Sequence, residues 1–348
     1  MHQPNWHRLK TDPQLRHKLE KRAQIVRAIR EYFWSQDFIE TETPTLVHVP
    51  GMEPYLDPFK TELRDEGGKR ADAYLITSPE YAMKKLLAGG MERIFQLTRS
   101  YRNRETLSTQ HSPEFTILEW YRANATYEDI MRDTEELVAY IARKVLGTTH
   151  VQYQGKPLEL APPWKRTSFA AALEQYAGVR YDEIETQAKL QALLRKRSYR
   201  VSDTDDWDTL VLQLFVQEVE PKLGQEQPEI IFDYPASQAA LATISPRDAR
   251  FAQRFEVYAR GIELCNAFNE LTDAAEQRRR LEEERKLRQQ LGKDDYPVDE
   301  TFLAALETGM PPAGGNALGV DRLAMLLLDT DRMADIVWCP WFEMFDLS

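Results

Sequence analysis

Two strand-like runs joined by a polar loop constrain this chain more than any other feature. Residues 93–102 and 115–122 have the residue pattern of strands, and residues 103–112 between them are polar. Two such runs joined by a loop favour a long antiparallel hairpin. The hairpin predicts an antiparallel sheet.

Helical patterns surround this hairpin. Apolar residues recur at three- and four-residue steps over 15–33 and over 127–146, and a short extended segment ends at Pro44. The further predicted strands are 73–77, 229–234, 254–260 and 262–270; the further predicted helices are 79–87 and 274–291; and a glycine-bearing strand from 314 leads into an apolar helix. Residues 149–224 mix prolines with helical stretches. We therefore expect an α+β fold, an antiparallel sheet flanked by helices, with a helical insertion over 149–224.

Charge and composition exclude several classes of function. Lys and Arg total 45 against 56 Asp and Glu, and the formal net charge of −11 argues against general nucleic-acid binding. The chain has no GxGxxG and no GxxxxGK[ST] motif, two distant cysteines, and six histidines without ligand-pair spacing. No signal peptide or apolar run long enough for a bilayer is present. We expect a cytoplasmic protein without membrane contact, a disulfide framework or a zinc site.

The hairpin carries residues suited to a nucleotide. Period-two geometry places Phe115, Glu119 and Tyr121 on one face of the second strand. Arg102 supplies a cation before the loop, and His111 lies near its end. A cation, acceptors and an aromatic ring are what an ATP-like ligand requires. The alternative is that these aromatics belong to the core.

A second polar group follows on later strands. Glu256, Glu263, Asn266 and Glu270 are costly to bury unless they meet cations. Two of the carboxylates could hold Mg²⁺ and another an ammonium group. Strict alternation places Asn266 with Glu270 but Glu263 on the opposite face, so a single site requires a bulge. The alternative is solvent-exposed strand carboxylates.

Arg322 opens the last predicted helix, directly after small residues that permit close approach of a ligand. A cation near a helix N-terminus suits a phosphate. The alternative is a surface ion pair.

Together these segments resemble the motifs of class II aminoacyl-tRNA synthetases. The carriers are TSPEYAMKKLL at 77–87, HSPEFTILEWY at 111–121, PASQA at 235–239, RFEVY at 254–258, GIEL at 261–264 and ALGVDRL at 317–323. The resemblance extends from about residue 15 to residue 336. It is closest to the lysyl branch, and there to the short paralogues that lysylate elongation factor P.

The resemblance implies an ATP-dependent ligase that activates lysine or (R)-β-lysine as an aminoacyl adenylate and transfers it to a lysine side chain of elongation factor P. The implied cofactors are ATP and Mg²⁺, with Arg102 and Arg322 as catalytic residues. The implied ATP-binding residues are Arg102, Asn103, Arg104, Glu105, His111, Ser112, Phe115, Glu263, Leu264, Gly319 and Arg322. The implied substrate-binding residues are Ser78, Pro79, Glu80, Glu119, Tyr121, Asn266, Phe268 and Glu270, and the implied metal ligands are Glu256 and Glu263.

The resemblance also bears on partners. It implies a homodimer formed through the helix and strand of residues 15–44. It implies a catalytic core over 1–348 without an anticodon-binding domain, so that tRNA is not the expected acceptor.

Two departures from the family pattern keep other functions open. Either Arg104 or Glu105 matches the family's adenine-binding glutamate, and Ser112 stands where the family has asparagine. Ala267 stands where the lysyl branch has glycine, and its methyl group is expected to alter the pocket. The alternatives are an amino-acid ligase with another acceptor and a non-catalytic, amino-acid-sensing paralogue.

Overall fold

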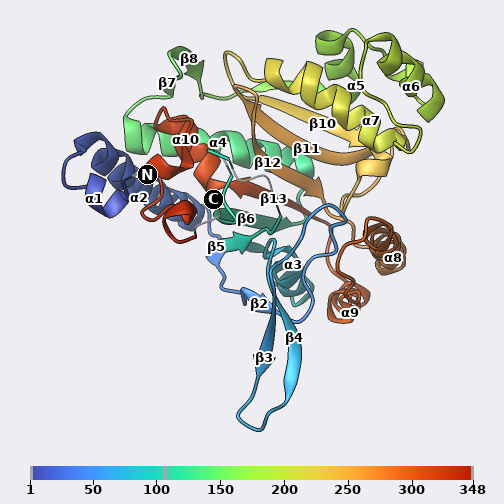
Figure 1. Ribbon diagram of the computed structural model, residues 1–348, viewed down its shortest axis with the longest axis horizontal. Helices are drawn as coiled ribbons and strands as arrows, with labels where there is room; N and C mark the ends of the chain where they lie inside the picture. Colours follow the sequence, from blue (N-terminus) through green and yellow to red (C-terminus); the bar gives the residue numbers. More distant parts are fainter. Residues whose placement is uncertain (1–2, 105–107, 110, 346–348) are drawn as a thin grey trace.

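An eight-stranded sheet forms the centre of the protein (Figure 1), whose computed structural model describes residues 3–104, 108–109 and 111–345. In spatial order its strands are β1 (Ile39–Glu40), β5 (Arg93–Tyr101), β6 (Glu114–Ala123), β13 (Ala313–Gly319), β12 (Ile262–Asn269), β11 (Phe251–Ala259), β10 (Glu229–Pro235) and β9 (Lys165–Ser168). All neighbours pair antiparallel except β1 with β5 and β9 with β10 at the two edges. The predicted α+β fold and the predicted hairpin are confirmed.

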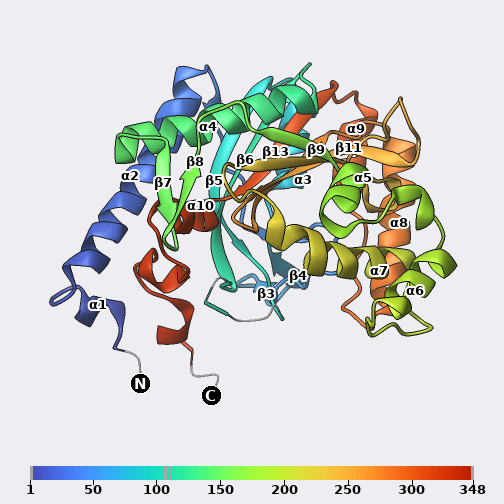
Figure 2. The ribbon, with the colours of Figure 1, turned by 90° about the horizontal axis from the view of Figure 1, so that it is seen from above.

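Three helices cover one face of the sheet. They are α2 (Pro13–Ser35), α4 (Tyr127–Leu146) and α10 (Val320–Leu327). Phe33, Leu137 and Leu323 from these helices join Trp120 and Phe255 from the strands in one buried core. Figure 2 shows α4 running across the strands. This core fixes the sheet and leaves its other face for a site.

Side-chain caps fix where two of these helices begin. The Asp12 carboxylate accepts hydrogen bonds from the backbone N–H groups of Gln14 and Leu15 at 3.1 and 3.0 Å. Thr126 and Asp129 form a capping box before α4. Such caps satisfy N–H groups that lack a partner within the helix. Both helices therefore start within two residues of their predicted positions.

The other side of the sheet carries α3 (Glu80–Ala88), α8 (Ala274–Gln290) and α9 (Glu300–Glu307). Met83 and Leu87 of α3 pack with Phe302 and Leu303 of α9 in a second buried cluster. The rings of Tyr81 and Phe302 stack with their centroids 4.4 Å apart. Within the described residues no helix has the length and apolar character needed to cross a bilayer.

The segment 149–224 differs from the predicted helical insertion at its start. Residues before Phe169 form strands: β7 (His150–Tyr153) and β8 (Lys156–Glu159) pair with each other, and β9 joins the main sheet. The helical part begins with α5 (Phe169–Ala172) and continues through α6 (Gln187–Lys196), α7 (Trp207–Leu214) and short turns to Lys222. It has its own core around Phe169, Leu190 and Leu210. Only the part from Phe169 to Lys222 is therefore helical, because the prolines and helical stretches of 149–224 gave no signal for the short strands that precede Phe169.

A small sheet projects from the body near α3 (Figure 1). Its strands are β2 (Leu46–Val47), β4 (Arg70–Leu75) and β3 (Lys60–Arg64). At the other end of the molecule, α1 (Asn5–Arg8) lies against the C-terminal segment. There the Asn5 side chain donates to the Ala334 and Val337 carbonyls at 2.7 and 2.9 Å.

A buried ion pair joins three distant parts of the chain. The Arg22 guanidinium on α2 donates to Asp321 Oδ1 on α10 at 2.6 Å, and both side chains are at least nine-tenths buried. The backbone N–H of Thr116 on β6 donates to Asp321 Oδ2 at 2.7 Å. The Thr116 hydroxyl accepts from Arg22 at 2.9 Å. Helix α2, strand β6 and helix α10 are thereby held in one relative position.

Replacing Arg22 by Leu should lower the free energy of unfolding by about 3–5 kcal/mol, because it leaves a buried carboxylate without its cation. Urea denaturation monitored by circular dichroism measures this loss. The double variant Arg22→Leu/Asp321→Leu removes both charges and should recover part of it. A single variant as stable as the wild type would show that this pair does not hold the three elements together.

Candidate active site

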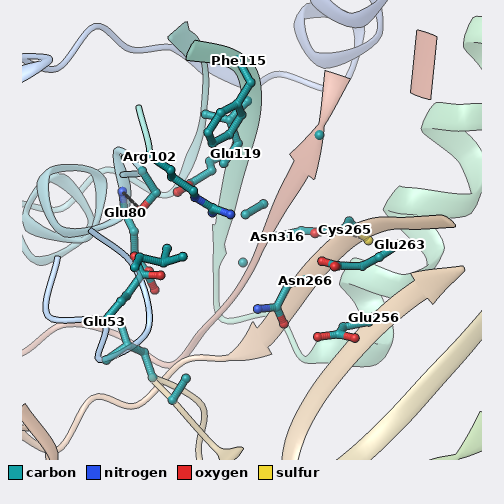
Figure 3. Close-up of a pocket in the computed structure, with 18 of the residues that line it drawn as sticks. Glu53, Glu80, Arg102, Phe115, Glu119, Glu256, Glu263, Cys265, Asn266 and Asn316 are labelled. Atoms are coloured by element: carbon teal, nitrogen blue, oxygen red, sulfur yellow. Dashed lines mark hydrogen bonds between the residues drawn. The ribbon is translucent and has the colours of Figure 1, made fainter. Parts of the chain in front are cut away.

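A cavity of about 470 Å³ lies on the face of the sheet opposite α4. Strands β6, β11, β12 and β13 form its floor, and α3, α8 and the segment before β3 form its rim. Figure 3 shows Glu119 reaching into this space from β6, and Glu263 and Asn266 reaching into it from β12. Most residues predicted for a site therefore meet in one place.

The predicted face of β6 lies in the cavity. Phe115, Glu119 and Tyr121 line it, whereas Leu118 and Trp120 between them are in the core on the other side. The two sets of residues lie on opposite faces because successive side chains of a strand point to opposite sides of the sheet.

A bulge in β12 brings Glu263 to the same side as Asn266. On β11, Val257 pairs with Cys265 and the next residue, Tyr258, pairs with Glu263, so Leu264 is the extra residue on β12. An extra residue reverses the alternation of side chains along a strand. The bulge that the single-site hypothesis requires is present.

Arg102, Arg254 and Arg322 line the cavity. The Arg102 guanidinium lies over the Phe115 ring, 5.0 Å from its centroid. Arg322 Nη1 donates to the carbonyl oxygen of Glu263 at 3.0 Å and lies 3.3 Å from its carboxylate. Arg322 Nη2 is 3.3 Å from His111 Nε2. This end of the cavity can receive an anionic ligand.

The two predicted metal ligands differ in their surroundings. Glu256 is held by the protein: Arg254 donates to Oε1 at 2.6 Å, and the hydroxyls of Tyr234 and Tyr258 donate to Oε2. Burial and the neighbouring Glu256 raise the pKa of Glu263. In the described part of the chain, no three His, Cys, Asp or Glu side chains form a metal cluster. Mg²⁺ commonly uses one or two carboxylates together with substrate phosphates, so this pair fits such an ion, with Glu263 the more available ligand.

The inner end of the cavity is acidic. Glu119 and Glu270 are 1% and 2% exposed, and Glu80 lies beside them. Burial raises the pKa of Glu270 to about 7, with Glu80 adding to the shift and Lys84 opposing it. Burial and Glu80 also raise the pKa of Glu119. Tyr121 donates its hydroxyl to Glu119 Oε2 at 3.0 Å.

A glycine leaves room for this acidic end. A Cβ at Gly315 would lie 2.3 Å from the Tyr121 ring and 2.4 Å from Glu270 Oε1. Such distances are shorter than van der Waals contact, so only glycine fits without displacing the two side chains.

Other predicted residues lie elsewhere. Pro79 precedes α3 and Asn103 pairs by its backbone with Asp57, and neither lines the cavity. Arg104 is exposed, and Glu105 lies outside the described residues. The expectation for Ala267 is wrong, since this residue is buried in the core on the opposite face. The remaining predicted residues line the cavity: Ser78, Glu80, Arg102, His111, Ser112, Phe115, Glu119, Tyr121, Glu256, Glu263, Leu264, Asn266, Phe268, Glu270, Gly319 and Arg322.

Several charged residues of the site were not predicted. Glu53, Arg254 and Glu284 line the cavity, and Lys84 is buried at its inner end. Arg254 lies within the family segment 254–258, and Lys84 within 77–87, so both could have been found there. Glu53 and Glu284 lie in a loop and in a highly charged helix, where no local pattern distinguishes them.

Comparison with known proteins identifies the family. The sequence matches the family described as tRNA synthetases class II (D, K and N) over residues 3–342. The chain belongs to the class II tRNA synthetases. The predicted resemblance to this family is thus confirmed.

Two kinds of class II relative are similar to this chain at the same level of identity. Elongation factor P–(R)-β-lysine ligases from Haemophilus influenzae strain PittGG and Erwinia tasmaniensis are 39% and 40% identical, over 92% of this chain and 93% of each relative. A lysine–tRNA ligase from Moorella thermoacetica is 39% identical over 94% of this chain. The chain spans 66% of that ligase's length, and 64% of a second one from Pelotomaculum thermopropionicum.

Gly315→Ala should destabilise the fold by about 1–3 kcal/mol, because the added methyl meets a buried ring and a buried carboxylate. Thermal unfolding measures the loss. The matched control is Gly319→Ala, whose Cβ would have its nearest neighbours, atoms of Arg322 and Leu264, at 3.8 Å and should fit without strain. Equal stability of the two variants would contradict the packing described for Tyr121 and Glu270.

Glu284→Gln should stabilise the protein at pH 8 and have little effect at pH 4.5. Burial, with Glu53 and Glu80 adding to it, raises the pKa of Glu284 from 4.5 to about 8. The folded state thus holds a proton that the unfolded chain releases, so stability from this group is present below pH 4.5 and is lost as the pH rises toward 8. Thermal unfolding at the two pH values tests this. Glu282→Gln, an exposed change on the same helix, should show no such pH dependence, and an identical response of both variants would refute the assignment.

Proposed function

We propose that the protein activates a diamino acid, lysine or (R)-β-lysine, with ATP and transfers it to a lysine side chain of elongation factor P. The observation that carries the proposal is the buried acidic end formed by Glu119, Tyr121 and Glu270, at the far end of a cavity that also holds arginines. Buried carboxylates need cations. An amino acid with a second ammonium group supplies one, whereas an apolar side chain would leave Glu119 Oε1 and Glu270 Oε1 without a donor.

In this proposal ATP binds at the end of the cavity that Arg102 and Arg322 line. Phe115 stacks on adenine, and His111 and Ser112 lie near the phosphates, since all three line the cavity. Arg102 binds the α-phosphate and the amino-acid carboxylate, and Arg322 binds the γ-phosphate. Leu264 and Gly319 offer backbone close to the ligand, since both line the cavity.

The first reaction step needs no general base. The amino-acid carboxylate is already an anion, and one of its oxygens attacks the α-phosphorus of ATP while the bond to pyrophosphate breaks. Positioning and neutralisation of charge by Arg102 and Arg322 supply the catalysis. Glu263, together with Glu256, would hold Mg²⁺, which neutralises phosphate charge when bound.

Substrate contacts complete the proposed site. The inner ammonium lies against Glu119, Tyr121 and Glu270, and the amino group near the carboxylate lies against Glu80. The further contacts we propose are Ser78, Asn266 and Phe268, which line the cavity. In the second step the acceptor amine attacks the carbonyl carbon of the adenylate, AMP leaves, and an amide forms.

The proposed acceptor rests on the relatives. Proteins named elongation factor P–(R)-β-lysine ligases match this chain along 93% of their own length. A relative named lysine–tRNA ligase has the same level of identity, 39%. The second candidate acceptor is therefore tRNA, and it is tested alongside elongation factor P.

Amino-acid-dependent exchange of pyrophosphate into ATP tests the first step. We expect exchange with lysine or (R)-β-lysine, and no exchange in Arg322→Ala, which lacks the proposed γ-phosphate ligand. The matched control is Arg278→Ala, because Arg278 on α8 forms an exposed ion pair with Glu300 on α9. Full exchange by Arg322→Ala would overturn the site, and no exchange with any diamino acid would favour a sensing role.

Transfer of labelled amino acid tests the acceptor. Elongation factor P and tRNA are offered separately to the protein with ATP and the activated amino acid. Label on elongation factor P is the expected result. Label on tRNA alone would assign the second candidate, and exchange without either transfer would indicate another acceptor.

We also propose a homodimer formed through α2 and β1. The parallel edge strand β1 and its surroundings expose large apolar side chains: Trp34 is 53%, Ile39 56% and Leu46 43% exposed. Sedimentation equilibrium at micromolar concentration should give twice the chain mass, and Ile39→Asp should shift the population to monomer. A monomeric wild-type protein would contradict the proposal.

A further inference from the structure

Lys84 places a positive charge at the inner end of the cavity. Its side chain is fully buried, and its Nζ lies 2.6 Å from Glu80 Oε1 and 2.6 Å from Glu270 Oε2. The Phe268 ring lies on another side, with its centroid 6.0 Å from Nζ. Lys84 therefore contacts two of the carboxylates that the proposed function assigns to the substrate.

Other carboxylate oxygens at this end are left for a ligand. Glu270 Oε1 and Glu119 Oε1 are buried and have no hydrogen-bond partner among the residues that the structure describes. Glu119 Oε2 accepts from the Tyr121 hydroxyl. Buried carboxylate oxygens without donors are costly, so their arrangement points to a ligand that brings positive charge.

The charged side chains at the inner end of the cavity can be balanced against the charges of a substrate. Glu80, Glu119 and Glu270 carry three negative charges when ionised, and Lys84 balances one of them. Two remain, which equals the number of ammonium groups on a diamino acid. The carboxylate of such a substrate is left for Arg102, which lines the same cavity.

We propose that Lys84 is a positioning residue that sets this balance: it neutralises one carboxylate and orients Glu80 and Glu270 so that two negative charges receive the two ammonium groups of one substrate molecule. The inference rests on the diamino-acid function proposed above. It assigns to Lys84 no contact with the reacting atoms.

The groups that face Lys84 define the pH dependence. They are Glu80 on α3, Glu119 on β6, Phe268 on β12 and Glu270 directly after β12. Tyr121 on β6 interacts with the same three carboxylates. Lys84 lowers the pKa of Glu270, which burial and Glu80 raise. Without Lys84 this pKa must rise, so Glu270 is protonated at neutral pH and loses its attraction for an ammonium group.

The experiment compares Lys84→Met with the wild type in two measurements. Carbon-13 NMR of glutamate-labelled protein, with Glu270→Gln to assign the signal, follows the titration of Glu270. Pyrophosphate exchange over pH 6–9 follows KM and kcat for lysine and (R)-β-lysine. We expect the Glu270 titration to move upward and KM at neutral pH to rise about tenfold per pH unit of that movement, with KM recovering as the pH rises.

Two further variants keep the test decisive. Lys84→Arg retains the charge and should leave the Glu270 titration where it is in the wild type. Lys84→Gln removes the charge but keeps a polar side chain, and it serves as the neutral variant if Lys84→Met does not fold. In Lys84→Gln the Glu270 titration should also move to higher pH. An unmoved Glu270 titration in the neutral variants, or a rise in KM that is the same at every pH, would overturn the inference. Failure of the wild type with every diamino acid would instead overturn the proposed function.

Discussion

The ion pair between Arg22 and Asp321 is the contact on which the site depends. Asp321 accepts hydrogen bonds from Arg22 on α2 and from the Thr116 N–H on β6, so helix α2, the central hairpin and helix α10 are fixed together. Arg322 is the next residue, and it lies against Glu263 and His111. The position of Arg322 follows from that of Asp321, which precedes it in the sequence. A structural contact thus aligns residues that come from three distant parts of the sequence.

The chemistry of the cavity works against its stability. Glu270 and Glu284 have pKa values raised to about 7 and 8, mainly by burial, which means that their ionised forms are disfavoured where they lie. Gly315 leaves the space that Glu270 and Tyr121 occupy. A chain selected for stability alone would fill this end with apolar side chains. Keeping carboxylates there is understandable if a cationic ligand completes the site.

Residues on regular elements could be predicted from the sequence, and those that depend on irregular or long-range packing could not. The face of β6 with Phe115 and Glu119 follows from strand period alone, and the position of Arg322 from a strand that leads into a helix. The place of Glu263 in the cavity depends on the bulge at Leu264. Strict alternation along the strand would put Glu263 on the opposite face. For the same reason of alternation, Ala267 lies on the core face and not in the cavity. Lys84 lies within the family segment 77–87, but its contact with Glu270 could not be predicted, because the two residues are far apart in the chain and meet only when α3 packs on the sheet.

The central claim is that the inner end of the cavity binds an ammonium group. Isothermal titration calorimetry with lysine, (R)-β-lysine and norleucine tests it most directly, because norleucine keeps the length of lysine and replaces the distal ammonium by a methyl group. We predict binding of a diamino acid and an affinity for norleucine lower by a factor on the order of 10² or more, since its methyl group leaves Glu119 Oε1 and Glu270 Oε1 without a donor. Equal affinities for lysine and norleucine would contradict the account.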